Sequence, residues 1–226
     1  MQGDSIQVLA ISTAQAQNFT VGQRTLRTGH FKQPQAGAVD IGTEGIAGDF
    51  IGNPKHHGGP DQALYLYSQA DADWWANELD RTALPAGFFG ENLTIDDWWP
   101  AVRVGDRLQC GDLLLEITGP RIPCATLAAR VGDAGFAKSF VKAERPGAYV
   151  RVLQSGEIKA GDSLQVQPAS EAFPTVVELY RFWHTRRQDA SFVQRTLAAP
   201  VASRMRAELE ELAARQAKET QPLPGI

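Results

Sequence analysis

Short apolar runs separated by glycine-containing turns dominate the first three quarters of this chain. Clear examples are 6–12, 113–118, 148–153 and 163–166, where branched or aromatic side chains are concentrated. Apolar runs of this length, bounded by turn residues, are typical of buried β-strands. Gly-Asp turns join several of these runs, and few helical segments intervene. The pattern therefore predicts a closed or nearly closed barrel rich in antiparallel strands.

The character of the chain changes after the last predicted strand. Apolar residues recur at helical spacing in three segments, 176–183, 192–197 and 201–215. The sequence thus predicts a mainly β protein with some α-helix, divided into a barrel domain over 1–168 and a three-helix C-terminal extension over 169–226. Helices of about a dozen residues are marginal on their own. We expect them to pack on the barrel or on a second copy of the chain, so a homodimer is one open assembly.

Two further helices are predicted within the barrel region. Residues 68–71 resemble a capping box with Asp in place of Glu, so a helix is expected to begin there and to continue over 71–79. Its Trp74 and Trp75 are expected to pack in the core rather than to bind a ligand. A second short helix is predicted over 136–142, where two phenylalanines lie on one side.

Composition excludes several classes of function. The 226-residue chain has a formal net charge of −4, so it has no general attraction to nucleic acid or to anionic membranes. No apolar run approaches the roughly 20 residues that cross a bilayer, and the N-terminus lacks the pattern of a secretion signal. Cys110 and Cys124 are too few for a disulfide framework or a four-cysteine zinc site. A cytoplasmic protein is expected.

Cys124 follows a stiff connection between a predicted strand and a predicted helix. Pro120 and Pro123 lack a backbone N–H and are expected to end the strand 113–118. The residues after Cys124 are good helix formers, and Arg121 lies three positions before it. A helix terminus and a nearby guanidinium both favour the thiolate, which is the nucleophilic and metal-binding form. The alternative is a free cysteine that packs as a small hydrophobic residue.

A basic cluster surrounds Thr28-Gly29. It contains Arg24, Arg27, His30 and Lys32 within nine positions. One interpretation is a solvated loop, and the other is an anion-binding loop in which several cations converge on a phosphate or carboxylate.

A glycine-rich loop leads into His57-Gly58-Gly59-Pro60-Asp61 and then into an apolar run at 63–67, which predicts a strand. Paired glycines allow a backbone to approach a ligand closely, and a histidine beside them can exchange a proton or bind a metal. A glycine turn with incidental histidines is the alternative. Glu91-Asn92, after another glycine, places a carboxylate and an amide at the rim of a barrel or simply at an exposed strand end.

Several motifs occur together in an order that is specific for one family. In chain order they are Thr28-Gly29 with Lys32, Gly48-Asp49, His57-Gly58-Gly59-Pro60-Asp61, Phe89-Gly90-Glu91-Asn92-Leu93, Gly105-Asp106 and Pro120-Arg121 with Pro123-Cys124. This combination resembles the MOSC family (molybdenum cofactor sulfurase C-terminal domain), in its stand-alone YiiM-like branch. The resemblance covers about residues 5–168, and the helical tail resembles the small C-terminal extension of that branch.

The resemblance implies a β-barrel-like fold in which Cys124 coordinates the molybdenum of a pterin-bound cofactor or carries sulfur for it. It also implies the reduction of N-hydroxylated compounds, including 6-hydroxylaminopurine. Two departures from the family pattern concern the shape of the substrate site. Ala148-Tyr149 replaces a frequent Gly-Trp pair, and His56 stands where an aliphatic residue is common.

The implied molybdenum cofactor, Mo-molybdopterin, assigns expected roles to particular residues. Its phosphate needs cationic and N–H donors, for which Arg27, Lys32, Arg121 and His57 are the candidates, with Asn92 beside them. Removal of an N–OH oxygen needs two electrons and a proton. His57, with an ordinary pKa of about 6.5, is the expected proton donor, and Glu91 is the second candidate.

The chain shows no dinucleotide-binding glycine fingerprint and no iron–sulfur cysteine set. A reductase role therefore implies a separate electron donor, expected to be a flavoprotein. Two alternatives remain open from the sequence. In one, the protein carries sulfur or the molybdenum cofactor to another protein without turnover of its own; in the other, it is a ligand-binding barrel with a structural cysteine.

Overall fold

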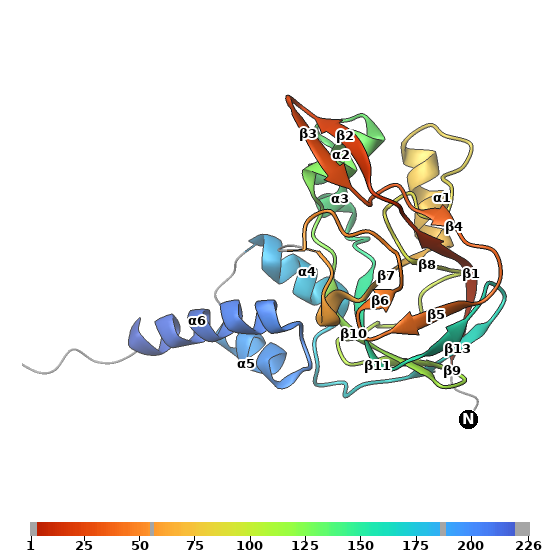
Figure 1. Cartoon of the computed structure of the whole chain (residues 1–226). Helices are drawn as coiled ribbons and strands as arrows, with labels where there is room; N and C mark the ends of the chain where they lie inside the picture. Colours follow the sequence, from red (N-terminus) through yellow and green to blue (C-terminus); the bar gives the residue numbers. More distant parts are fainter. Residues whose placement is uncertain (1–3, 55–56, 186–188, 220–226) are drawn as a thin grey trace, which may run out of the picture.

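The computed structural model of the chain describes residues 4–54, 57–185 and 189–219, and its central feature is a closed barrel (Figure 1). In spatial order, its strands are β13 (Ser163–Gln167), β9 (Arg107–Cys110), β10 (Leu113–Pro120), β11 (Ala148–Gln154), β7 (Leu64–Ser68), β8 (Leu93–Ile95) and β1 (Ser5–Thr13). An antiparallel pairing between β1 and β13 closes the sheet. Neighbouring barrel strands are antiparallel except β7 and β8, which run parallel. The predicted barrel is confirmed.

The barrel interior is a packed core. Inward-facing side chains from successive strands, among them Val8, Leu66, Leu115, Ile117 and Val150, are completely buried in one apolar cluster. Residues alternate between the inside and the outside of a barrel, and in a small barrel the inward-facing side chains fill the space. The interior therefore has no room for a ligand, and ligands must bind on the outside of the barrel or at its rim.

The smaller strands lie outside the barrel. They are β2 (Gln17–Val21), β3 (Arg24–Thr28), β4 (Gln33–Pro34), β5 (Val39–Gly42), β6 (Gly45–Ile46) and β12 (Gly156–Ile158). β2 pairs with β3 as a separate hairpin, and β5, β6 and β12 form a second small sheet, whereas β4 pairs with the end of barrel strand β1. The loop interpretation of the basic cluster was thus wrong for Arg24 and Arg27, which lie on β3. Four of the five β3 residues are exposed, so no alternation of apolar and polar residues marked the strand.

Helices cover the outside of the barrel around an aromatic cluster. They are α1 (Gln69–Glu78), α2 (Ala125–Val131) and α3 (Phe136–Ala143), with a short 3-10 helix, η1 (Pro60–Gln62). Trp75 stacks on Phe140 with ring centroids 5.7 Å apart and also contacts Phe136. Ser68 Oγ accepts a hydrogen bond from Asp71 N, which confirms the predicted start of α1. The cluster also buries Leu127 of α2, the helix that begins directly after Cys124.

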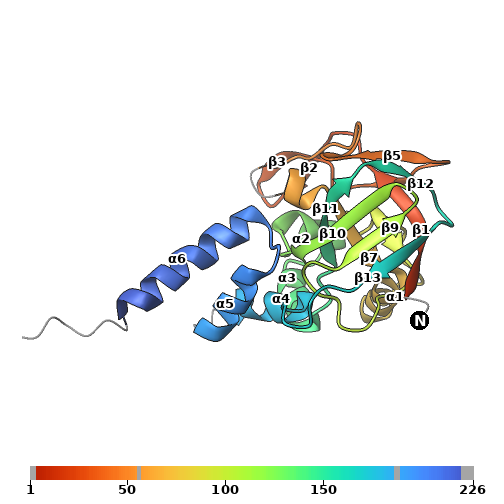
Figure 2. The same ribbon diagram turned by 90° about the horizontal axis from the view of Figure 1, so that it is seen from below.

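The predicted C-terminal helices are confirmed as α4 (Val176–Thr185), α5 (Ala190–Ala198) and α6 (Ser203–Glu219). α4 packs against β10, and α6 extends from the barrel alongside α5 (Figure 2). Across the part of the chain that the structure describes, no helix is both long and apolar enough to cross a membrane. The domain boundary at residue 168, the cytoplasmic location and the homodimer stay predictions.

Asp61 ties the loop that carries His57 to the C-terminal extension. Its Oδ2 accepts hydrogen bonds from Ser203 N at 2.6 Å and from Ser203 Oγ at 2.5 Å, at the start of α6. Its Oδ1 forms an ion pair with Arg151 Nη2 at 2.8 Å. Partial burial raises the pKa of the Asp61 carboxyl, but these bonds from Ser203 and Arg151 outweigh it and hold the pKa below its usual value.

Asp61→Ala should loosen α6 from the barrel. The variant loses an acceptor at the start of the helix and an ion pair, so we expect a loss of about 1–2 kcal/mol in the free energy of unfolding. Because the folded-state pKa of Asp61 is lowered, its contribution should be present at neutral pH and lost as the pH falls through that pKa. Urea unfolding with amide hydrogen exchange over α6 checks this, with exposed Asp40→Ala on β5 as the control. Unchanged exchange in α6 would contradict the assignment.

Candidate functional site

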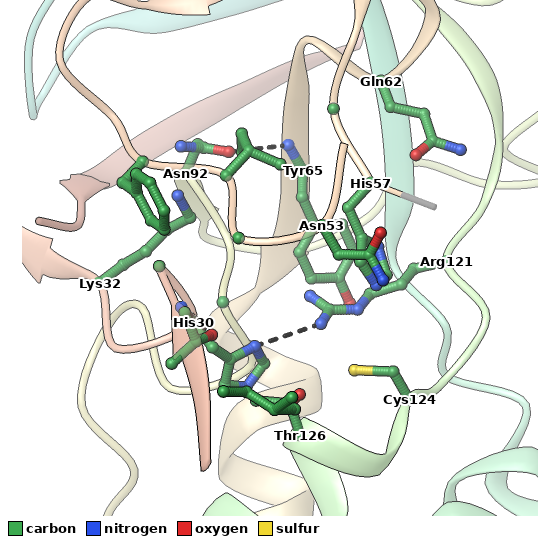
Figure 3. Close-up of a pocket in the computed structure, with 18 of the residues that line it drawn as sticks. His30, Lys32, Asn53, His57, Gln62, Tyr65, Asn92, Arg121, Cys124 and Thr126 are labelled. Atoms are coloured by element: carbon green, nitrogen blue, oxygen red, sulfur yellow. Dashed lines mark hydrogen bonds between the residues drawn. The ribbon is translucent and has the colours of Figure 1, made fainter. Parts of the chain in front are cut away.

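A cavity of about 460 Å³ lies beside the barrel, where several distant parts of the chain meet (Figure 3). Its walls come from β3 and the residues that follow it, residues 50–53 and 57–58, the start of β7, the turn before β8, and residues of the segment 121–126. A cavity of this size is in the range of small-molecule and cofactor sites. Because each wall is a loop or the end of an element, the barrel acts as the rigid support for the site.

The six residues expected to bind the cofactor all line this one cavity. They are Arg27, Lys32, His57, Asn92, Arg121 and Cys124. Their convergence is observed, whereas their roles stay predictions. Glu91 is not among the lining residues. His56, one of the two departures from the family pattern, lies outside the described residues.

Cys124 is the residue immediately before α2, with an extended backbone at φ −120° and ψ 164°. β10 ends at Pro120, which pairs with Ala148, so the expectation that the prolines end this strand is confirmed, with the strand two residues longer than predicted. A proline is tolerated there because the missing N–H falls at the end of the ladder. Burial raises the pKa of the Cys124 thiol, but a hydrogen bond with His57 and the charge of Arg121 outweigh it and lower the pKa to about 6. Most of the sulfur is therefore thiolate at neutral pH.

Arg121 provides a buried positive charge beside this sulfur. Its side chain is only 4% exposed, and its guanidinium lies over the Tyr65 ring with Cζ 4.6 Å from the ring centroid. Nη1 donates a hydrogen bond to Phe89 O at 2.5 Å. A guanidinium stays protonated at any physiological pH, so the cavity always contains this charge.

His57 lies between Cys124 and Tyr149. Its Nδ1 is 3.0 Å from Tyr149 Oη, and its ring also hydrogen-bonds the Cys124 side chain. Tyr149 is buried on β11, and burial raises the pKa of its phenol, so it remains protonated. The sequence marked Tyr149 only as a departure from the family pattern. The structure places it at the site as the polar group behind His57.

Lys32 is less available to bind an anionic ligand than its position in the basic cluster suggested. Its Nζ forms a buried ion pair with Asp49 Oδ2, which also accepts a hydrogen bond from Asn92 Nδ2 at 2.8 Å. Burial lowers the pKa of Lys32, and Asp49 only partly offsets this. The charge of Lys32 is therefore balanced by a carboxylate, and Arg27 and Arg121 are the other basic side chains of the predicted set that line the cavity.

His30 was a member of the basic cluster but was not singled out as a site residue. Its Nδ1 is 3.4 Å from Arg121 Nη2, and within the described ranges its buried Nε2 has no hydrogen-bond partner. Burial, followed by the charges of Arg121 and Arg130, holds the pKa of His30 well below its ordinary value, so the ring is neutral. Gly90, at φ +82°, makes room for it, because a Cβ there would lie 2.7 Å from His30 Nδ1.

Glu91 organises the turn behind the cavity. Its carboxylate accepts hydrogen bonds from Gly87 N at 2.5 Å, Phe89 N at 3.0 Å and Thr94 Oγ1 at 3.2 Å. The side chain is fully buried, and burial raises the pKa of its carboxyl despite these bonds. This arrangement explains Glu91 as the residue that shapes the turn carrying Gly90 and Asn92. The proton-transfer role stays an untested prediction.

Cys124 should react as a thiolate well below the usual pH of a cysteine. In metal-free protein with Cys110→Ser, iodoacetamide should alkylate Cys124 with a rate that reaches half its maximum near pH 6. His57→Ala removes a hydrogen-bond donor to the thiolate and should move this midpoint to higher pH. His184→Ala, on α4, is the matched control and should leave it unchanged. A midpoint near the usual pKa of about 8.5 would contradict the proposed environment.

Glu91→Gln should destabilise the fold. The amide group can no longer accept hydrogen bonds from all three donors, and a buried unpaired donor costs about 1–3 kcal/mol. Urea unfolding of the metal-free protein measures this, with exposed Glu157→Gln on β12 as the control. Full stability combined with a loss of turnover would instead assign Glu91 a role in proton transfer.

Comparisons with known proteins place the chain in a family. The MOSC domain model matches residues 53–165, which is half of the chain. The YflK protein of Bacillus subtilis is 26% identical over 204 residues, covering 90% of this chain and 92% of YflK. YiiM of Escherichia coli is 31% identical over 125 residues, covering 54% of this chain and 56% of YiiM.

A solved structure supports the same assignment at the level of the fold. The crystal structure of YiiM from Geobacillus stearothermophilus superposes with a TM-score of 0.75 at 23% identity. The match covers 92% of this chain and 99% of that one, so it includes the C-terminal helices. The family match spans the segment that contains His57 and Cys124 and half of the chain, and it shows that the chain belongs to the MOSC domain family.

Proposed function

We propose that this protein binds a molybdenum cofactor in the cavity and reduces N-hydroxylated compounds, such as 6-hydroxylaminopurine, with Cys124 as the molybdenum ligand. The observation that supports this most directly is the Cys124 thiol, with its pKa of about 6, in a cavity that also contains the Arg121 charge. When bound, the cofactor would supply a metal that accepts and transfers two electrons.

The donor set of the cavity fits such a group. Thiolate is a soft ligand that suits a thiophilic metal, and Cys124 is largely ionised at neutral pH. Across the described part of the chain, no group of three or more His, Cys, Asp or Glu side chains is arranged to hold a metal ion. One protein sulfur is sufficient if the pterin contributes its own sulfur atoms.

The anionic part of the cofactor would be held by the cations of the cavity. Arg121 offers a fixed guanidinium, and Arg27 is exposed near the cavity mouth, where its Cζ lies 5.2 Å from the centroid of the Phe50 ring. Guanidinium groups suit phosphate because they donate several hydrogen bonds in one plane. Lys32 and Asn92, both bonded to Asp49, would contribute less.

The protein's own part in the reaction concerns protons. Conversion of R–NHOH to R–NH₂ and water breaks the N–O bond and consumes two electrons and two protons. His57 is the candidate to deliver a proton to the leaving oxygen, because its ring lies beside Cys124 and the imidazole group commonly serves as a general acid. Tyr149 holds its Nδ1, which orients the ring. The electrons would come from a separate reductase, which we propose to be a flavoprotein.

Cys124→Ser tests this proposal directly. Protein made in a molybdenum-replete host should lose both its bound molybdenum and its reductase activity, because a serine hydroxyl is neither soft nor ionised at neutral pH. Elemental analysis and multiple-turnover assays with an electron donor measure the two effects. Cys110→Ser is the matched control and should keep both. Full activity of the Cys124→Ser protein would eliminate the ligand role.

A carrier of sulfur or of the cofactor is the second candidate. A reactive thiolate in an open cavity is also suited to holding a persulfide. The two candidates differ in turnover. Repeated reduction of an N-hydroxylated compound by the purified protein with an electron donor would reject the carrier-only role.

A further inference from the structure

One edge of the cavity mouth is apolar, in contrast to the cationic interior of the cavity. Four large hydrophobic side chains are exposed in the described part of the chain, and two of them, Leu26 and Ile51, line this cavity. Leu26 is 40% exposed on β3, and Ile51 is 37% exposed in the loop segment 50–53. Exposed apolar surface next to a binding cavity gains free energy when a ligand covers it.

Two glycines hold these two side chains at the same mouth. A Cβ on Gly29 would lie 1.7 Å from Phe50 O, and one on Gly52 would lie 2.4 Å from Arg27 O. The backbone around the end of β3 and the backbone of residues 50–52 therefore touch directly, which no larger residue at either glycine would allow. This contact joins the hairpin to the loop as one continuous edge of the cavity.

The same edge reaches the reacting part of the site. Ile51 packs on Gly58, where a Cβ would lie 3.1 Å from Ile51 Cγ2, and Gly58 directly follows His57. A group covered by Leu26 and Ile51 would therefore lie over the entrance through which a small molecule approaches His57 and Cys124. The cationic interior suits an anionic group, whereas this edge suits an uncharged ring.

We propose that Leu26 and Ile51 select the substrate by covering the face of its ring, so that ring-bearing N-hydroxylated compounds are preferred over small ones without a ring. The inference rests on the proposed function and deepens it. The face of a planar heterocycle is weakly hydrated, so contact with two aliphatic side chains favours binding without any hydrogen bond. A small polar compound has no apolar surface for this contact, so its binding should not depend on either residue.

The test compares two substrates in four serine variants. Leu26→Ser and Ile51→Ser are made in the full molybdenum-loaded protein, with Leu9→Ser and Leu153→Ser as controls, because these are 40% and 41% exposed and lie away from the cavity. The substrates are 6-hydroxylaminopurine and hydroxylamine itself. We expect each edge variant to lose about tenfold in kcat/KM for the purine, mainly through KM, with hydroxylamine unaffected. Leu26→Met, which keeps an apolar side chain, should stay close to the unchanged protein.

Equal losses for both substrates, or equal losses in the control variants, would overturn the inference. Calorimetric titration with 6-hydroxylaminopurine, without an electron donor, separates it from the proposed function. If the unchanged protein binds the purine but does not reduce it, the reductase proposal fails. Weaker binding of the purine by the edge variants, and not by the controls, would still support selection by Leu26 and Ile51. If binding is absent, or is equal in all variants, the inference itself fails.

Discussion

The site depends on one buried contact, between the guanidinium of Arg121 and the sulfur of Cys124. A buried cation is costly unless neighbouring groups stabilise it. Here the Tyr65 ring, the carbonyl oxygen of Phe89 and the ionised sulfur share that task. The same contact, together with the hydrogen bond from His57, keeps the sulfur in its metal-binding form. This pair thus contains both the positive charge and, with the help of His57, the thiolate that the proposed chemistry needs.

The histidine–glycine motif serves two purposes at once. His57 faces the cavity, whereas Asp61, four residues later, binds Ser203 at the start of α6. The glycines between them allow the chain to turn at positive φ, at 78° for Gly58 and 81° for Gly59. The loop that positions the proposed proton donor is therefore anchored by the C-terminal extension, so the extension supports the site although none of its described residues lines the cavity.

Much of the fold followed from local patterns in the sequence. The connection between strand and helix at Cys124 was predicted from the strand 113–118, the prolines and the helix formers that follow. Each of these features acts within a few residues. The hairpin of β2 and β3 was missed, since its strands are exposed and lack a buried face. Ion pairing of Lys32 was equally invisible, because its partner Asp49 is distant in sequence and lies in a loop.

The sequence by itself determined the barrel, the helical tail, the family and the set of polar residues that the site uses. Only the tertiary structure decided how those residues are charged and which of them face the cavity. Burial and contacts between distant segments set the neutral state of His30, the lowered pKa of Cys124 and the position of Tyr149 behind His57. These properties depend on neighbours that are remote in the chain, so no local pattern encodes them.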